Sequence, residues 1–164
     1  LAPAVIVLGA GVLQASVVPM LRLYAATANL TLLFVVGWGL LAGQPWSLVW
    51  SFAAGLVLDL ASGAPLGSNA LALLPVGLLA GYGRGSLLRG SLSLPVLAAG
   101  GGTLLYYAVS IVEQQALGYT VPVLLTIIYV VIPSAVLNAV IMPPCYWFLR
   151  GLHRNLHPTV RAEW

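Results

Sequence analysis

The sequence carries very little charge. Among its 164 residues, Lys and Arg together number six and Asp and Glu three, so charged side chains make up 5% of the chain and apolar ones 61%. Soluble domains usually contain about a quarter charged residues. So few charges cannot cover the surface of a water-soluble fold of this length. The composition excludes a cytosolic enzyme, a nucleic-acid-binding domain and a disordered linker, and it indicates an integral membrane protein.

Lysine is absent, and Cys145 is the only cysteine. A single cysteine forms no intrachain disulfide and no cysteine-rich metal site, so neither a disulfide framework nor a zinc module is expected. The net charge of +3 comes from arginines spread thinly along the chain. This pattern bears on membrane topology and predicts no nucleic-acid partner.

Long apolar runs between turn-forming residues predict a compact all-α bundle of six short transmembrane helices. A hydrocarbon core of about 30 Å requires about 20 helical residues at about 1.5 Å each. The six runs are Leu1–Leu21, Asn29–Gly43, Trp46–Ala61, Leu66–Gly83, Leu92–Val112 and Val121–Leu149. We expect the first to be a membrane helix, because it lacks the basic start of a signal peptide. Residues 1–152 are expected to form one membrane domain and residues 153–164 a basic cytoplasmic tail.

Two features complicate the count of six. The second and third runs are short, and Gly43-Gln44-Pro45 between them is tight enough only for a helical hairpin. The sixth run is too long for one straight span, and Pro133 is expected to divide it, leaving residues 121–131 as an interfacial or broken stretch. Five spans plus a re-entrant piece is therefore the alternative.

The arginines predict the orientation of the spans. Alternating loops place Arg22 alone on one side of the membrane and the other five arginines on the opposite side. Because loops rich in Lys and Arg stay in the cytoplasm, both termini are expected to be cytoplasmic. The five arginines of the cytoplasmic side are Arg84, Arg89, Arg150, Arg154 and Arg161.

Glycines spaced four residues apart predict close contacts between helices. They occur at Gly39–Gly43, Gly77–Gly81 and Gly81–Gly85, and Gly100-Gly101-Gly102 lies within an apolar run. Small residues let helix backbones approach each other closely in lipid. We interpret these glycines as packing positions within the bundle, and docking of a partner helix is the alternative.

Asp59 is the most informative polar residue. It lies near the outer end of the third span, with glycines four residues away on either side. A carboxylate in a membrane is costly, so it is usually buried in the bundle and partnered. Three roles are open: an anchor for the turn Ser62–Gly67, a proton or ion relay, and a ligand contact. The anchor is favoured, because a relay needs a second ionisable group at similar depth and Glu113 lies at a span boundary.

Other polar residues predict structural roles. Ser68 and Asn69 are expected to cap the fourth helix, and Asn138 to bond across helices or to satisfy carbonyls freed by Pro133. His153, near the C-terminus, is expected in the solvated tail. The sequence contains no Ser/His/Asp set, phosphate loop, metal-ligand set or carboxylate pair. We therefore predict a protein that is not an enzyme and that uses no cofactor or metal.

The stretch Gly55–Gly67 has the pattern Gly-x-x-x-Asp-Leu-x-Ser-Gly-x-x-Leu-Gly, which resembles the central signature of the MreD family. Weaker similarity to that family's first hairpin and C-terminal region is carried by Leu13–Ser16, Ala28–Leu30, Ser134–Asn138, Met142-Pro143 and Tyr146–Arg154. The resemblance covers nearly the whole chain. The positions that it singles out are Gly55, Asp59, Ser62, Gly63, Pro65, Gly67 and Asn138.

The resemblance implies a rod shape-determining protein of the bacterial inner membrane. Such a protein would act without catalysis in the elongation machinery that inserts peptidoglycan along the cell cylinder. The implied partner is MreC, a bitopic membrane protein, and through it RodA, a class B penicillin-binding transpeptidase and MreB. The resemblance also implies a bundle similar to the substrate-binding subunits of energy-coupling-factor transporters, with an outward-facing cleft.

Our hypothesis is a scaffold that holds the membrane helix of MreC by helix–helix recognition and otherwise contacts membrane lipids. The alternative is a substrate-binding membrane subunit of a vitamin or small-solute transporter. It is disfavoured because the outer half of the chain offers few polar side chains. A proton-coupled exporter would need a carboxylate deeper in the membrane than Asp59.

Overall fold

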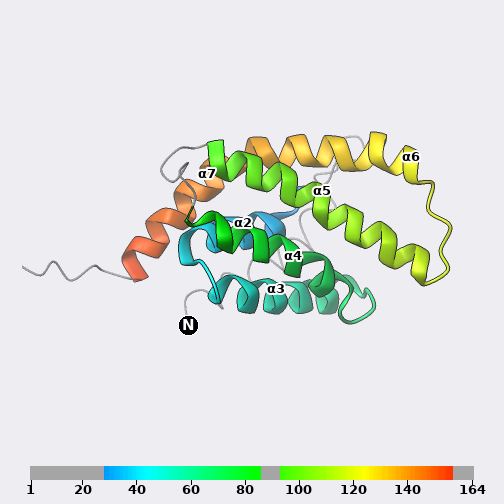
Figure 1. Ribbon diagram of the computed structural model, residues 1–164, viewed down its shortest axis with the longest axis horizontal. Helices are drawn as coiled ribbons and strands as arrows, with labels where there is room; N and C mark the ends of the chain where they lie inside the picture. The colour runs from blue at the N-terminus through cyan, green and yellow to red at the C-terminus, as the bar shows by residue number, and fades with distance from the viewer. Residues whose placement is uncertain (1–27, 86–92, 157–164) are drawn as a thin grey trace, which may run out of the picture.

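The computed structural model describes residues 28–85 and 93–156, and these residues form five helical rods (Figure 1). Helix α2 spans Leu30–Ala42, α3 spans Trp46–Ser62, α4 spans Ser68–Gly83 and α5 spans Ser93–Ala116. The fifth rod joins α6 (Val123–Thr126), the π-helical η2 (Ile127–Val131) and α7 (Ile132–Leu156). The first predicted span, Leu1–Leu21, lies outside the described residues.

Four of the remaining predicted spans match these helices to within four residues at each end, and the last helix continues seven residues beyond its predicted end at Leu149. The predicted α2–α3 hairpin is confirmed. Gly43 adopts a φ of +72°, a backbone conformation that favours glycine, and the Gln44–Pro45 peptide bond is cis. The Gln44 side chain donates a hydrogen bond of 3.1 Å to the carbonyl of Leu78. The hairpin is thereby fastened to α4.

Helix α2 is the centre of the bundle, although it is only 13 residues long. Every residue from Thr31 to Leu40 is buried, and α3, α4, α5 and α7 all contact this helix. Its residues are apolar on all sides, which is typical of a helix surrounded by other helices. Leu32, Leu33, Val35 and Val36 have at most 1% of their surface exposed and form the middle of the core.

Close contacts through glycine hold α2, α3 and α4 together, and α3 and α4 share the most extensive contact of any two helices described. A Cβ atom added to Gly55 would lie 2.2 Å from the Cα of Ala70, so the two backbones touch there. One added to Gly77 would meet the side chain of Ser51, and one added to Gly39 the Cβ of Ala80. The interpretation as packing positions is confirmed for Gly39, Gly77, Gly81 and Gly102, whereas a Cβ added to Gly101 would meet nothing within 4 Å.

Two described helices are long and apolar enough to cross a membrane, namely Ser93–Ala116 with 24 residues and Val123–Arg154 with 32. Helix α5 lies beside α7 and then slopes away from α6 toward the α5–α6 connection (Figure 1). Helices α2, α3 and α4 are shorter, at 13, 17 and 16 residues. The predicted total of six spans remains a prediction.

The expectation that Pro133 divides the last run is wrong. The helix continues from Val123 through Pro133, and residues 121–131 form no separate broken piece beyond the turn before α6. A proline removes one backbone N–H and its ring meets the carbonyl four residues earlier. The π-helical turn just before Pro133 absorbs this change, since the Ile132 N–H bonds the carbonyl of Ile127, five residues back.

His153 also differs from the expectation of a solvated tail. Helix α7 runs on to Leu156, and the imidazole of His153 packs edge-on against the indole of Trp38 with ring centres 5.4 Å apart. Trp38 lies on the central helix α2 and is itself buried. His153 is therefore part of the packed bundle.

Candidate functional site

The Asp59 carboxylate joins the end of α3 to the start of α4. Asp59 is 1% exposed. One carboxylate oxygen accepts the backbone N–H of Gly67 at 2.8 Å. The other accepts the backbone N–H of Asn69 at 2.9 Å and the Asn69 side-chain amide at 2.8 Å. Asp59 therefore satisfies two of the free N–H groups at the start of α4 from the preceding helix, which is the geometry of a turn anchor.

The other residues of the stretch Gly55–Gly67 shape the same turn. Gly63 ends α3 with a left-handed φ of +67°, and Gly67 precedes α4 with a φ of +102°. Added Cβ atoms at these two glycines would meet nothing within 4 Å. Glycine is therefore favoured here by the positive φ angle and not by a lack of room for a side chain. The Ser62 hydroxyl bonds the carbonyl of Leu58 at 2.7 Å. The pattern thus encodes a helix, a turn and a second helix packed closely against the first.

Helix α4 is capped differently from the expectation. Its N-cap residue is Gly67, and no side chain of that residue can accept a bond. Ser68 and Asn69 are already the first helical residues, so they do not accept from the free amides of α4 as predicted. Asp59 performs this role across the turn.

Tyr106 is a member of this network that the sequence did not indicate. Its hydroxyl donates a hydrogen bond to the side-chain oxygen of Asn69, and the Ser110 hydroxyl bonds the Tyr106 carbonyl at 2.9 Å. A tyrosine within an apolar run gave no signal for this contact, because Tyr106 lies 37 residues beyond Asn69 in the sequence. Through Asn69, the buried carboxylate of α3 is connected to α5.

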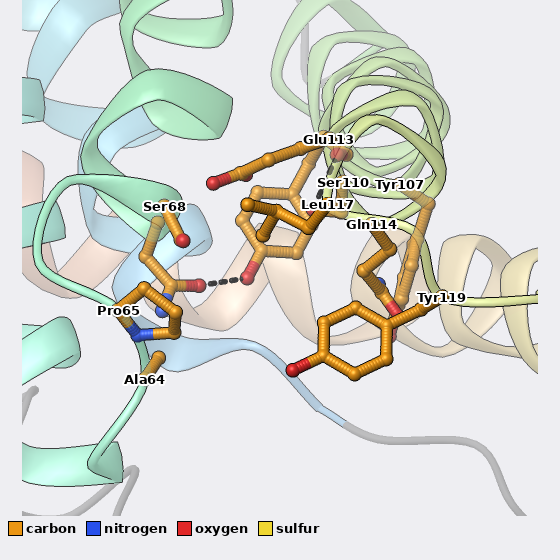
Figure 2. A pocket seen from close by; sticks show the side chains of 11 residues that line it. Ala64, Pro65, Ser68, Tyr107, Ser110, Glu113, Gln114, Leu117 and Tyr119 are labelled. Carbon is orange, nitrogen blue, oxygen red and sulfur yellow. Dashed lines mark hydrogen bonds between the residues drawn. The ribbon is translucent and has the colours of Figure 1, made fainter.

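A cleft of about 450 Å³ opens between this turn and α5 (Figure 2). It lies at the end of the bundle that carries the α3–α4 turn and the α5–α6 connection, which we call the turn end (Figure 1). Its lining residues come from the turn, the start of α4, the second half of α5 and the segment after it. They are Ala64, Pro65, Ser68, Asn69, Tyr106, Tyr107, Ser110, Glu113, Gln114, Leu117 and Tyr119.

Glu113 brings a carboxylate into the cleft. In Figure 2 its side chain extends from α5 toward Ser68 at the start of α4, and Tyr119 lies at the near side of the opening. Glu113 is half-buried, and Tyr119 is 65% exposed. The cleft therefore combines hydrogen-bonding groups, one acid and aromatic surface, and its volume is in the range of about 300–1,000 Å³ that small-molecule sites occupy.

Asn138 does not belong to the cleft. Its side-chain oxygen accepts the Asn29 backbone N–H at 3.0 Å, and its amide donates to the Thr103 hydroxyl at 3.0 Å. Asn29 itself caps α2 by accepting the Leu32 N–H at 2.9 Å. Asn138 is fully buried, so it fixes α7 to α5 and to the start of the central helix. Of the two expected roles, it takes the bond across helices.

The sequence positions singled out by resemblance therefore fall into two places. Gly55, Asp59, Ser62, Gly63, Pro65 and Gly67 build the α3–α4 hairpin, and of these Pro65 also lines the cleft. Asn138 belongs to the buried network between α2, α5 and α7. Within residues 28–85 and 93–156, no three His, Cys, Asp or Glu side chains come together as metal ligands.

Across the part of the chain that the structure describes, these features define an all-helical protein with two membrane-length helices and a hydrogen-bonded hairpin at one end. The family model of the rod shape-determining protein MreD matches residues 1–156. The chain belongs to the MreD family, a family of membrane proteins of the bacterial cell envelope that determine rod shape. No curated protein and no solved structure matches the chain.

Proposed function

We propose that this protein is a non-catalytic membrane scaffold of the peptidoglycan elongation complex and that it binds MreC. Membership of the MreD family, which acts in rod-shape determination, supports the proposal at the level of the process. The observation that carries the binding role is the cleft beside the Asp59-anchored turn. Its walls are fixed by hydrogen bonds between three helices, as a docking site for another protein requires.

In the proposed topology the turn end faces outward and both termini are cytoplasmic. Arg84, Arg150 and Arg154 line one pocket at the opposite end of the bundle, which we call the arginine end. Positively charged ends of membrane helices face the cytoplasm. The multi-pass chain then presents the cleft at the outer boundary, where the extracytoplasmic part of a bitopic partner begins.

The single membrane helix of MreC would pack against exposed apolar residues of α5 and α6. Leu104, Val112 and Leu124 are 49%, 66% and 71% exposed on this pair of helices. The segment of MreC that follows its helix would enter the cleft and meet Glu113, Ser110 and Tyr119. Through MreC the scaffold would be connected to RodA, the class B penicillin-binding transpeptidase and MreB.

Co-purification with MreC in mild detergent tests this function, with an unrelated bitopic protein as the control. The cleft is tested by Ala64→Trp, which places a large ring among the lining residues. The matched variant Ala61→Trp changes an exposed alanine three residues earlier that does not line the cleft. We expect a stoichiometric complex with the wild type and Ala61→Trp, and loss of MreC from Ala64→Trp.

The volume of the cleft also favours a second candidate, the solute-binding subunit of a small-solute transporter. The same purification separates the two. If MreC is absent from the purified wild-type protein and mass spectrometry detects a retained small vitamin, the scaffold function is refuted in favour of the transporter subunit. A stable complex from which Ala64→Trp removes nothing would refute the cleft as the docking site.

A further inference from the structure

The arginine end contains a basic pocket of about 360 Å³ that the scaffold function does not use. Arg84 follows the last residue of α4, whereas Arg150 and Arg154 project from α7 one helical turn apart. His153 and Tyr146 complete its polar wall. The end of α4 and the last turns of α7, which are far apart in the sequence, thus contribute three arginines to the lining of one pocket.

The positive charge of this pocket has no carboxylate partner among residues 28–85 and 93–156. The acidic residues in those ranges are Asp59, which is bonded to the turn, and Glu113, which lines the cleft at the turn end. Arg84 donates one N–H to the carbonyl of Ala42, and a guanidinium has five N–H donors. Like charges one helical turn apart destabilise each other, so an anion in the pocket would stabilise this end of the bundle.

An apolar groove of about 310 Å³ continues from the pocket along α4 and α5. The two cavities share Leu40, Gly83 and Leu94 as lining residues. From Leu94 to Gly102 the groove follows α5 for about 12 Å at about 1.5 Å per residue. Gly101 lies in its wall, and a Cβ added there would meet nothing within 4 Å.

We propose that the pocket and the groove together bind one anionic phospholipid. The phosphate is held by Arg150, Arg154 and Arg84, and one acyl chain lies in the groove between α4 and α5. Guanidinium groups bind phosphate oxygens in pairs of hydrogen bonds, and basic pockets between membrane helices are sites for anionic headgroups. A lipid matches both cavities, whereas free phosphate would occupy the basic pocket alone.

Native mass spectrometry of the full chain in detergent tests the site, with dioleoylphosphatidylglycerol as the probe and dioleoylphosphatidylcholine as the neutral control. We expect the anionic lipid to be retained preferentially and to withstand excess inorganic phosphate. Arg150→Gln and Arg154→Gln should each lower its affinity about fivefold. Equal retention of both lipids, displacement by inorganic phosphate, or unchanged affinity in both variants would overturn the proposal.

The acyl chain is tested by filling the groove. Gly101→Leu adds a side chain to the wall of the groove, at a position where an added Cβ would meet nothing within 4 Å. Ala108→Leu adds the same side chain at an exposed position seven residues further along α5 that lines neither cavity. Weaker retention of the anionic lipid by Gly101→Leu alone supports the groove as the chain site. Equal retention by both variants would overturn it.

Discussion

Replacement of Asp59 by alanine should strongly destabilise the α3–α4 hairpin. The change removes three hydrogen bonds to a carboxylate that is 1% exposed and leaves the N–H groups of Gly67 and Asn69 without their acceptor. A hydrogen bond to a charged group contributes about 1.5–3 kcal/mol. Because water reaches part of the turn, we expect a loss of about 3–5 kcal/mol, less than the full sum.

The assay is thermal unfolding of the purified protein in one detergent. For a chain of this size, about 1 kcal/mol corresponds to a shift of about 2–4 °C in Tm, so Asp59→Ala should lower the apparent Tm by about 10 °C. Asp59→Asn keeps one acceptor oxygen but turns an amide donor toward a backbone N–H, and it should lose about 2 kcal/mol. Ser62→Ala, in the same turn but exposed, serves as the control and should stay within about 0.5 kcal/mol of the wild type.

Two results would refute this reasoning. One is an apparent Tm for Asp59→Ala within about 2 °C of the wild type, since the anchor would then contribute nothing. The other is an Asp59→Asn protein of normal stability and normal assembly that has lost a proton-linked transport activity. That combination would make Asp59 a relay instead of an anchor.

Two further predictions concern packing. Gly55→Ala should lower the free energy of unfolding by about 1–3 kcal/mol through its contact with Ala70. Gly101→Ala should raise it by up to about 1 kcal/mol, because alanine has the higher helix propensity. Equal Tm shifts for the two variants would contradict this contrast. Asn138→Leu should cost about 2–4 kcal/mol and should speed amide exchange at Asn29, because that N–H loses its acceptor. Unchanged exchange at Asn29 would show that this bond does not hold α2 in place.

Much of the helical layout could be predicted from the sequence. Apolar runs and the turn residues between them located α2 to α5 within a few residues, because backbone polar groups in an apolar environment must bond within a helix. Gly43 and Pro45 predicted the α2–α3 hairpin, because the backbone conformations that these two residues adopt favour a turn. The glycine spacing predicted close contacts between helices, because a glycine has no side chain that would keep two backbones apart. This property belongs to the residue itself and needs no knowledge of its partner.

The tertiary partners could not be predicted in the same way. The central position of the short helix α2 could not be predicted, because apolar residues on every side are typical of lipid-facing and of buried helices alike. Tyr106 reaches Asn69 over 37 residues of sequence, and His153 reaches Trp38 over a still longer separation. Pro133 was expected to break its helix because the π-helical turn that accommodates it has no sequence signal of its own.

The central claim is that MreC docks at the cleft of the turn end, and site-specific photo-cross-linking in cells tests it most directly. In the test variant a photoreactive phenylalanine analogue replaces Tyr119, which lines the cleft and is 65% exposed. In the control variant it replaces Tyr82, which is 70% exposed and lies at the end of α4 away from the cleft. We predict a covalent adduct with MreC from position 119 and none from position 82. An adduct from position 82 with none from position 119 would contradict the claim.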